Sequence, residues 1–310
     1  MTDSQPESFL REPTSLVTIL APAKINLILR ILDRCPDGYH NLWSIMHTVG
    51  LEDTIRIQLS VDRDDIQLHC DSEHLVADRN NLVYRAALAV LDRTQRSIGL
   101  EIELEKRIPM GAGLGGGSSD AAATILGLNR LLGLGWSRAQ MAEIGQTLGS
   151  DVPFFLFAPS ALVAGRGEIV KPVRIEGEKW TVLVNPGFGV ETRWAYHELA
   201  STRGAVRSLS SVHRSLEQGE FVTWKQIAEA AENDFESPVF SHHGILREIK
   251  QALLSHGAEI ALLSGSGATV FGVFPNEAQA RQAQAWCASM PRCTVYVVPA
   301  CSTALAVLDG

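Results

Sequence analysis

Three polar residues, two close together near the start of the chain and one far from them, carry side chains suited to phosphoryl transfer. Lys24 and Asn26 alternate with aliphatic residues, and Asp151 follows a Gly-Ser pair and precedes Val-Pro. A carboxylate can act as general base toward an alcohol, and a neighbouring lysine lowers its pKa and keeps it ionised. A carboxylate and a lysine, together with a phosphate site, predict phosphoryl transfer to a hydroxyl. A solvated strand lysine and an Asx-turn aspartate are the alternatives.

A glycine-rich run is the candidate phosphate site. It reads Pro109-Met110-Gly111-Ala112-Gly113-Leu114-Gly115-Gly116-Gly117-Ser118-Ser119 and leads into an Ala- and Leu-rich stretch. Glycines let a ligand approach the backbone, successive N–H groups bind anions, and the start of a helix adds the positive end of its dipole. A serine at that point can cap the helix or bind a magnesium ion that bridges phosphates.

Three other interpretations of this run are weaker. A flexible linker would not pass directly from an apolar strand into an Ala-rich helix. A P-loop needs Gly-Lys-Ser/Thr at the helix start, and here no lysine follows the glycines. A dinucleotide fingerprint should follow a strand directly, whereas Pro109 and Met110 interrupt the entry.

The hydrophobic pattern predicts the elements that position these residues. We expect strands at 16–32, 43–60, 64–70, 98–107, 180–185, 258–263, 268–274 and 293–298, with a hairpin at 161–173. We expect helices at 80–94 with Asn80 as cap, at 119–133, at 137–148 behind a Ser137 capping box, and at 191–200, 221–233, 243–256 and 276–289. The Ser-rich stretch 201–219 is expected to be a loop. Strands interleaved with helices predict an α+β protein.

The length of 310 residues suggests two domains, and we place their boundary near residue 175. The prediction is a flexible tail at 1–14, an N-terminal domain at 15–175 and a C-terminal domain at 176–310.

Composition and charge exclude several classes of protein. A net charge of −8 disfavours binding to nucleic acid or to an anionic membrane, and no apolar run is long enough to span a bilayer. The start of the chain shows no signal or transit pattern. The cysteines are odd in number and scattered, so we expect a reducing, cytoplasmic setting; they are Cys35, Cys70, Cys287, Cys293 and Cys301.

Two further segments carry candidate binding groups. Asp37-Gly38-Tyr39-His40 offers a tyrosine that can stack on a flat ring and a histidine that can form hydrogen bonds; an ordinary turn is its alternative. A second glycine-rich turn, Leu263-Ser264-Gly265-Ser266-Gly267-Ala268-Thr269, follows a buried strand and is otherwise a tight hairpin.

Together these motifs resemble those of the GHMP kinases (galacto-, homoserine, mevalonate and phosphomevalonate kinases). The glycine run matches the ATP-binding motif of that family. The other matches follow in family order along nearly the whole chain: Ala21-Pro22-Ala23-Lys24-Ile25-Asn26-Leu27, Pro36-Asp37-Gly38-Tyr39-His40, Gly149-Ser150-Asp151-Val152-Pro153-Phe154-Phe155, Gly165-Arg166-Gly167-Glu168, Asn233-Asp234-Phe235-Glu236 and Leu263-Ser264-Gly265-Ser266-Gly267-Ala268. The Asp-Gly-Tyr-His segment resembles the branch that acts on a cytidine-diphosphate alcohol.

The resemblance implies a two-domain GHMP kinase fold. Its N-terminal half would be like domain 2 of ribosomal protein S5 and its C-terminal half ferredoxin-like. The γ-phosphate of ATP would move to the 2-hydroxyl of a small cytidine-diphosphate substrate, with Mg²⁺ as cofactor. Asp151 would be the catalytic base, and Lys24 would stabilise its carboxylate and the transferring phosphoryl group.

The same resemblance assigns the binding residues. Residues 109–119 would cradle ATP, Lys106 would lie near the adenine, and Ser119 is a candidate magnesium ligand, although the sequence does not choose between it and Ser118. The predicted substrate-binding residues are Asn26, Tyr39, His40, Thr192 and Tyr196. Tyr39 would stack on the cytosine, His40 would hydrogen-bond its edge, and Tyr196 would cover its other face.

Two alternatives remain at the level of sequence. Another GHMP kinase, of the homoserine or mevalonate type, would not need the Asp37-Gly38-Tyr39-His40 segment. A nucleotide-binding relative without catalysis would not need both Lys24 and Asp151. The oligomeric state cannot be read from the sequence.

Overall fold

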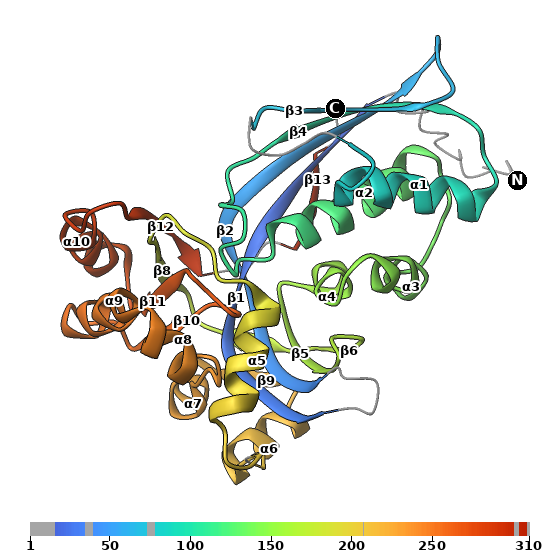
Figure 1. Cartoon of the computed structure of the whole chain (residues 1–310). Helices are drawn as coiled ribbons and strands as arrows, with labels where there is room; N and C mark the ends of the chain where they lie inside the picture. The colour runs from blue at the N-terminus through green and yellow to red at the C-terminus, as the bar shows by residue number, and fades with distance from the viewer. Residues whose placement is uncertain (1–15, 35–39, 73–77, 207, 301–303, 309–310) are drawn as a thin grey trace, which may run out of the picture.

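Two large β-sheets with helices against them form most of the described chain, and Figure 1 shows the two units side by side. A third sheet has only two short strands. The computed structural model describes residues 16–34, 40–72, 78–206, 208–300 and 304–308. The N-terminal elements are β1 (Leu16–Arg34), β2 (His40–Ser60), β3 (Ile66–Cys70), α1 (Leu82–Thr94), β4 (Gly99–Glu105), α2 (Gly116–Leu131), α3 (Arg138–Leu148), α4 (Val152–Phe157), β5 (Ser160–Gly165) and β6 (Ile169–Pro172).

The C-terminal elements begin with a short strand. They are β7 (Arg174–Glu176), β8 (Lys179–Asn185), α5 (Thr192–Thr202), α6 (Ser211–Gln218), β9 (Phe221–Thr223), α7 (Trp224–Ala230), α8 (Glu236–His242), α9 (Gly244–Ser255), β10 (Ile260–Leu263), β11 (Val270–Phe274), α10 (Glu277–Cys287), β12 (Thr294–Ala300) and β13 (Ala306–Leu308). The alternation of strands and helices confirms the α+β prediction.

The long antiparallel pair β1–β2 is the central frame of the fold. Its sheet has the order β13-β1-β2-β4-β3, and β5 pairs with another part of β2 and with β6. Helices α1 to α4 lie on one side of this pair (Figure 1). The pairing of β1 and β2 shifts register after Pro22 and again after Asn26. The frame therefore bends at the residues that were predicted to carry the chemistry.

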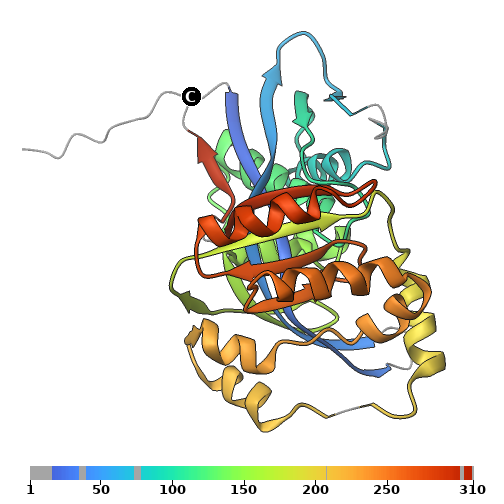
Figure 2. The same cartoon turned by 90° about the vertical axis from the view of Figure 1, so that its left-hand side faces the viewer.

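The second sheet has the order β10-β11-β8-β12 and is antiparallel throughout. Helices α9 and α10 contact it and lie in front of it in Figure 2. If the four strands are numbered in chain order, their order across the sheet is 2-3-1-4. This is the order expected of a ferredoxin-like unit.

The alternation of residues along β1 separates two layers of packing. Ile25 and Leu27 join a buried apolar group that includes Leu183 of β8 and Phe271 of β11. Side chains at successive strand positions point to opposite faces. Lys24 and Asn26 therefore face away from the second sheet and toward the N-terminal helices.

The end of the chain returns to the first sheet. Strand β13 pairs antiparallel with β1 through Thr18, Ile19 and Leu20. A domain boundary near residue 175 would place β13 in the C-terminal domain, although this strand belongs to the sheet of the N-terminal domain. The tail predicted at 1–14 lies outside the described residues, and among those described no helix has the length and hydropathy to cross a bilayer.

Two predicted helix starts were wrong by a few residues. Helix α2 begins at Gly116 and not at 119, because Gly115 in a left-handed conformation turns the chain and the next two glycines already form the first helical turn. Helix α1 begins at Leu82, and its cap is Asn81 and not Asn80, since the Asn81 side chain accepts from the N–H of Val83.

Two predictions in the second half were also wrong. The stretch expected to be a loop holds helix α6, which Ser210 and His213 start with a reciprocal cap. The helix predicted at 221–233 divides into strand β9 and helix α7, because Thr223 forms a capping box with Gln226. Both errors come from local caps that the hydrophobic period does not reveal.

Candidate active site

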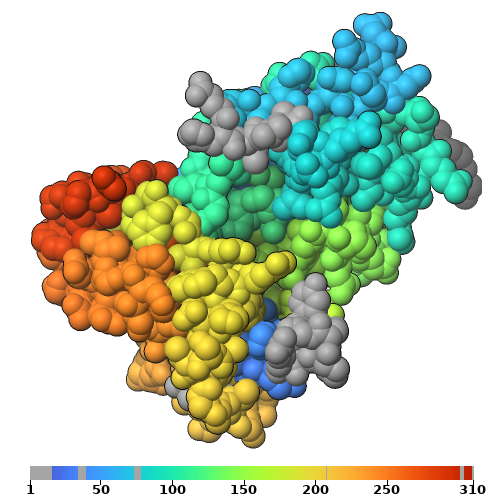
Figure 3. Space-filling view, in the orientation of Figure 1, coloured from blue at the N-terminus to red at the C-terminus, as the bar shows by residue number. Residues whose placement is uncertain are grey.

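A cavity of about 540 Å³ opens between the glycine run, β1 and the turn after β10. The space-filling view is hollowed between the green N-terminal elements and the yellow helix α5 (Figure 3). Of the predicted site residues, those on its wall are Lys24, Asn26, Lys106, Pro109 to Ser118, Asp151, Thr192 and Tyr196. His40 and Ser119 are not among the lining residues, and Tyr39 lies outside the described residues.

The glycine run is held from both sides, so it is a built loop and not a linker. The carbonyl of Leu114 accepts from the N–H of Lys24 at 2.9 Å, and the carbonyl of Ala112 accepts from the N–H of Thr269 at 3.2 Å. At Gly113 a Cβ would lie 2.0 Å from the carbonyl oxygen of Ser264, so no side chain fits there. The loop therefore joins β1 to the turn of the second domain.

The loop turns directly into helix α2, whose first residues line the cavity. Gly115 is the N-cap, with φ 70°. A Cβ at Gly115 would lie 2.9 Å from Cγ of Lys24, so the lysine reaches the cavity only because a glycine stands there. The unpaired N–H groups at the start of α2 meet the cavity where Gly116, Gly117 and Ser118 line it. This geometry suits a phosphate group.

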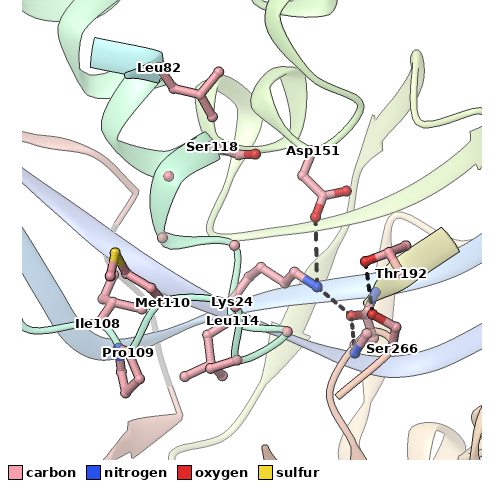
Figure 4. Close-up of a pocket in the computed structure, with 18 of the residues that line it drawn as sticks. Lys24, Leu82, Ile108, Pro109, Met110, Leu114, Ser118, Asp151, Thr192 and Ser266 are labelled. Carbon is pink, nitrogen blue, oxygen red and sulfur yellow. Dashed lines mark hydrogen bonds and ion pairs between the residues drawn. The ribbon is translucent and has the colours of Figure 1, made fainter. Parts of the chain in front are cut away.

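Lys24 and Asp151 meet at one end of the cavity (Figure 4). The Nζ atom of Lys24 lies 3.7 Å from Oδ2 of Asp151. Asp151 is the N-cap of α4, but its carboxylate makes no capping bond and so stays directed at the cavity. The Lys24 side chain is only 4% exposed, whereas that of Asp151 is 30% exposed. The carboxylate is therefore reachable by a substrate hydroxyl.

Asn26 fixes the lysine and links the two domains. Its Oδ1 accepts from Nζ of Lys24 at 2.6 Å and from the N–H of Gly265 at 2.9 Å. Its Nδ2 donates to Oγ of Ser44, which in turn donates to the carbonyl of Ile28. Every polar atom of the Asn26 amide is thus oriented by the protein, so it acts as a support for Lys24.

Burial governs the charge at this end. It lowers the pKa of Lys24 below the ordinary value, and the charge of Asp151 opposes that shift. The single carboxylate, which is partly exposed, only partly compensates the charge of the buried ammonium. The ammonium would therefore also stabilise the negative oxygens of a phosphoryl group placed beside it.

The opposite end is apolar and rests on a second buried lysine. Leu82, Ile108, Pro109 and Met110 form its wall. Beneath it, Nζ of Lys106 forms ion pairs with Asp53 and, at 2.7 Å, with Asp120. The structure thus places Lys106 at the apolar end, with its ammonium already paired with Asp53 and hydrogen-bonded to Asp120.

These carboxylates also shape the entry to the glycine run. Oδ1 of Asp53 accepts from the N–H of Arg107 at 2.5 Å and from that of Ile108 at 2.9 Å. Burial is the largest cause that raises the pKa of Asp120, to about 8, against the opposing charge of Lys106. Burial acts to lower the pKa of Lys106, but the charges of Asp120 and Asp53 and the hydrogen bonds with them outweigh it and raise that pKa.

Aromatic and hydroxyl groups stand beyond the Lys24 end. Oγ1 of Thr192 lies 3.0 Å from Oγ of Ser266. The ring of Tyr196 is stacked on that of His40, with centroids 5.0 Å apart and planes 18° apart, and it meets Phe235 edge-on at 4.9 Å. Burial, with a smaller contribution from the charge of Asp151, raises the pKa of Tyr196 to about 12.

The two candidate serines differ in position. Ser118 lines the cavity, whereas Oγ of Ser119 is buried and has no hydrogen-bond partner among the described residues. Within that part of the chain no three His, Cys, Asp or Glu side chains gather as a metal site. A magnesium ion here would depend on phosphate oxygens and a serine, a ligand set that suits it.

Sequence reasoning missed several wall residues. Asn80, Asn81 and Leu82 line the cavity because α1 begins beside α2. Their signal, an Asn pair before an apolar helix, had suggested only a cap. Phe235, Gly265 and Ser266 belong to quoted motifs, but only the fold shows that those motifs reach this cavity.

Comparisons with known proteins agree with this geometry. The family model for the GHMP kinases N terminal domain matches residues 81–158, and that for the GHMP kinases C terminal matches residues 213–292. A 4-diphosphocytidyl-2-C-methyl-D-erythritol kinase of Syntrophus aciditrophicus is 43% identical over 87% of this chain and 94% of its own length. The enzyme of the same name from Syntrophotalea carbinolica is 43% identical over 86% of this chain and 92% of its own.

Solved structures give the same grouping. A crystal structure of 4-(cytidine 5'-diphospho)-2C-methyl-D-erythritol kinase superposes with a TM-score of 0.74 at 33% identity, covering 91% of this chain and 98% of that one. A homoserine kinase from Cytophaga hutchinsonii has a TM-score of 0.70 at 18% identity, covering 97% of this chain and 99% of that one. The second likeness is one of fold alone.

Proposed function

This chain belongs to the GHMP kinase family, and on that premise we propose that it is a 4-diphosphocytidyl-2-C-methyl-D-erythritol kinase. It transfers the γ-phosphate of ATP to the 2-hydroxyl of 4-diphosphocytidyl-2-C-methyl-D-erythritol and yields the 2-phosphate and ADP. This reaction belongs to the non-mevalonate pathway to isoprenoids.

One observation carries the proposal. Lys24 and Asp151, which are distant in sequence, lie 3.7 Å apart on the wall of the cavity that the glycine loop also lines. A phosphate cradle, a cation and a carboxylate within one cavity are the parts that phosphoryl transfer to an alcohol needs.

The Asp151 carboxylate takes or orients the proton of the substrate hydroxyl. Because its oxygens make no capping bond to α4, they are free to accept that proton. Lys24 pairs with this carboxylate and neutralises charge on the transferring phosphoryl group. Asn26 holds Nζ of Lys24 in place from the other side.

The cavity has room for ATP in one orientation. The apolar wall at Leu82, Ile108 and Met110 suits the purine ring, and the start of α2 suits the phosphates. The γ-phosphate then points toward the Lys24 end. When bound, Mg²⁺ would supply charge neutralisation between phosphate oxygens, held on the protein side by Ser118.

The acceptor lies on the far side of Lys24. Tyr196 offers an aromatic face and Thr192 a hydroxyl, and His40 stands against Tyr196. These groups suit a cytosine ring and its polar edge. Tyr39 is proposed as a second stacking ring.

A coupled ADP-release assay tests the function. Purified protein would be offered 4-diphosphocytidyl-2-C-methyl-D-erythritol, homoserine and mevalonate at matched concentrations, with ATP and Mg²⁺. We expect a kcat/KM for the cytidine compound at least about a hundredfold above the others, since buried polar groups reject acceptors that cannot pair with them. Turnover of homoserine or mevalonate alone would overturn the assignment, and ADP release without any acceptor would show only ATP hydrolysis.

A further inference from the structure

A second cavity, of about 1100 Å³, lies behind the frame that carries the candidate active site. Met46 lines the first cavity and His47, the next residue of β2, lines the second. Successive strand residues point to opposite faces, so β2 separates the two cavities. They share no described lining residue. The other walls of the second come from the starts of α3, β5, β8, β9 and α7, the ends of α4 and β12, and strands β6 and β7.

The second cavity has more cationic than anionic side chains on its wall, although the protein as a whole has a negative net charge. Four cations line it, Arg138, Lys171, Arg174 and Lys179, against the two carboxylates of Glu178 and Glu220. The chain as a whole has a net charge of −8. Within the described part of the chain, neither Arg138 nor Arg174 forms an ion pair, so their charge is available to an anion.

Aromatic side chains give the cavity flat apolar walls. Phe157, Trp180, Phe221 and Trp224 line it. The indole of Trp224 is fixed, because its Nε1 donates to the carbonyl of Gly177 at 2.8 Å. The guanidinium of Arg174 lies 5.7 Å from the ring centre of Phe221, which places a cation at the rim of the apolar wall. Apolar walls with a few placed polar groups are typical of small-molecule sites.

His47 gives the cavity a buried polar group with unused capacity. It is 4% exposed, and its Nδ1 lies 2.7 Å from Oγ of Ser160. Its Nε2 has no hydrogen-bond partner among the described residues. Burial lowers the pKa of His47 to about 4, against an opposing interaction with the backbone of Ala300, so the ring is neutral at pH 7. A polar ligand atom in the cavity would supply this nitrogen with a hydrogen bond.

We propose that this cavity is a second ligand site, which binds a small organic anion with a flat apolar body, of the aryl phosphate class. The anionic group lies at Arg138 and Arg174, and the flat body lies against Trp180 and Trp224. Binding there requires neither ATP nor the acceptor proposed above, because the two cavities have separate walls.

Calorimetric titration with 2-naphthyl phosphate tests the proposal on the full chain. The first cavity is kept filled with a non-hydrolysable ATP analogue and Mg²⁺. We expect one molecule to bind with a dissociation constant below about 1 mM, and inorganic phosphate and 2-naphthol each to bind at least about tenfold more weakly. Absence of binding, displacement by the ATP analogue, or equal affinity for inorganic phosphate would overturn it.

Two double variants locate the site. Arg138→Gln with Arg174→Gln should weaken 2-naphthyl phosphate at least about tenfold, since both removed charges face the anion. Arg214→Gln with Arg247→Gln removes the same charge from exposed residues outside both cavities and should change the affinity less than about twofold. Equal affinities of the first variant and the wild type contradict the site, and ADP release by each variant shows that it is folded.

Discussion

Two buried lysines at opposite ends of one cavity have opposite environments. Lys24 faces a single carboxylate at 3.7 Å that is 30% exposed, and burial lowers its pKa. Lys106 lies between two carboxylates that are at most 3% exposed, and its pKa is raised. Burial alone therefore does not decide the state of a lysine; the number and burial of its partners do.

The difference indicates separate roles. The charge of Lys106 is satisfied before any ligand arrives, and its partner Asp53 also fixes the entry to the glycine loop. The charge of Lys24 is only partly compensated, so negative charge that develops beside it is stabilised. One lysine holds the site together, and the other acts on the substrate.

Replacing Lys24 with Met should separate catalysis from stability. We expect kcat to fall about 10³-fold, because a cation at the transferring phosphoryl group is lost. Thermal stability should stay the same or rise, since a weakly paired buried charge is removed. ADP-release kinetics and thermal melts check both, with exposed Lys225→Met as the matched control. A kcat within about tenfold of the wild type would make Lys24 a structural residue.

Replacing Lys106 with Met should produce the reverse pattern. The buried Asp53 carboxylate would lose its cation and Asp120 would lose a hydrogen-bond donor, so we expect a loss of about 3–5 kcal/mol in the free energy of unfolding. Urea denaturation measures it. Adding Asp120→Asn should recover part of that loss. A loss below about 1 kcal/mol would show that this lysine is no more important to the fold than a surface ion pair.

The pH dependence of stability sharpens the comparison at Asp120. Its pKa is raised from 3.8 to about 8 in the folded chain, so folding takes up a proton between these values. The contribution of Asp120 to the free energy of unfolding is fully present below pH 3.8. It falls as the pH rises toward 8, by up to about 1.4 kcal/mol per pH unit. The melting temperature of Asp120→Asn minus that of the wild type should therefore rise from pH 5 to 8 and then level off. If the melting temperatures of the two proteins changed with pH in parallel, the proton taken up on folding would not be bound by Asp120.

The two serines provide the smallest contrast. Ser118→Ala should lower kcat/KM for ATP about tenfold, equivalent to ~1.4 kcal/mol, because its hydroxyl faces the phosphates. Ser119→Ala removes a buried hydroxyl that has no partner in the described chain and should leave kcat/KM within about twofold. Steady-state kinetics decides between them, and a larger effect at Ser119 would assign the magnesium ligand to it.

The sequence was sufficient for local features with strong patterns. The alternation around Lys24 predicted β1, and the Ser137 capping box predicted the start of α3. It could not reveal that Asp53 and Asp120 both reach Lys106, because that meeting depends on how β2, β4 and α2 pack. The depth of burial of Lys24 also follows from packing, since the strand pattern alone allowed a solvated lysine.

The second half was harder for the same physical reason. Helices α6 and α7 are short and depend on caps at Ser210 and Thr223, which outweigh a weak hydrophobic period. The cavity walls at Leu82 and Phe235 come from neighbours in space that no sequence spacing indicates.

Turnover of Asp151→Asn with 4-diphosphocytidyl-2-C-methyl-D-erythritol tests most directly whether the Lys24 end is the phosphoryl-transfer centre. The amide keeps the shape of the side chain but cannot take the hydroxyl proton. We predict that kcat falls at least about a hundredfold, while the affinity for ATP changes less than about threefold. Near-normal turnover would contradict the account and remove Asp151 from the reaction.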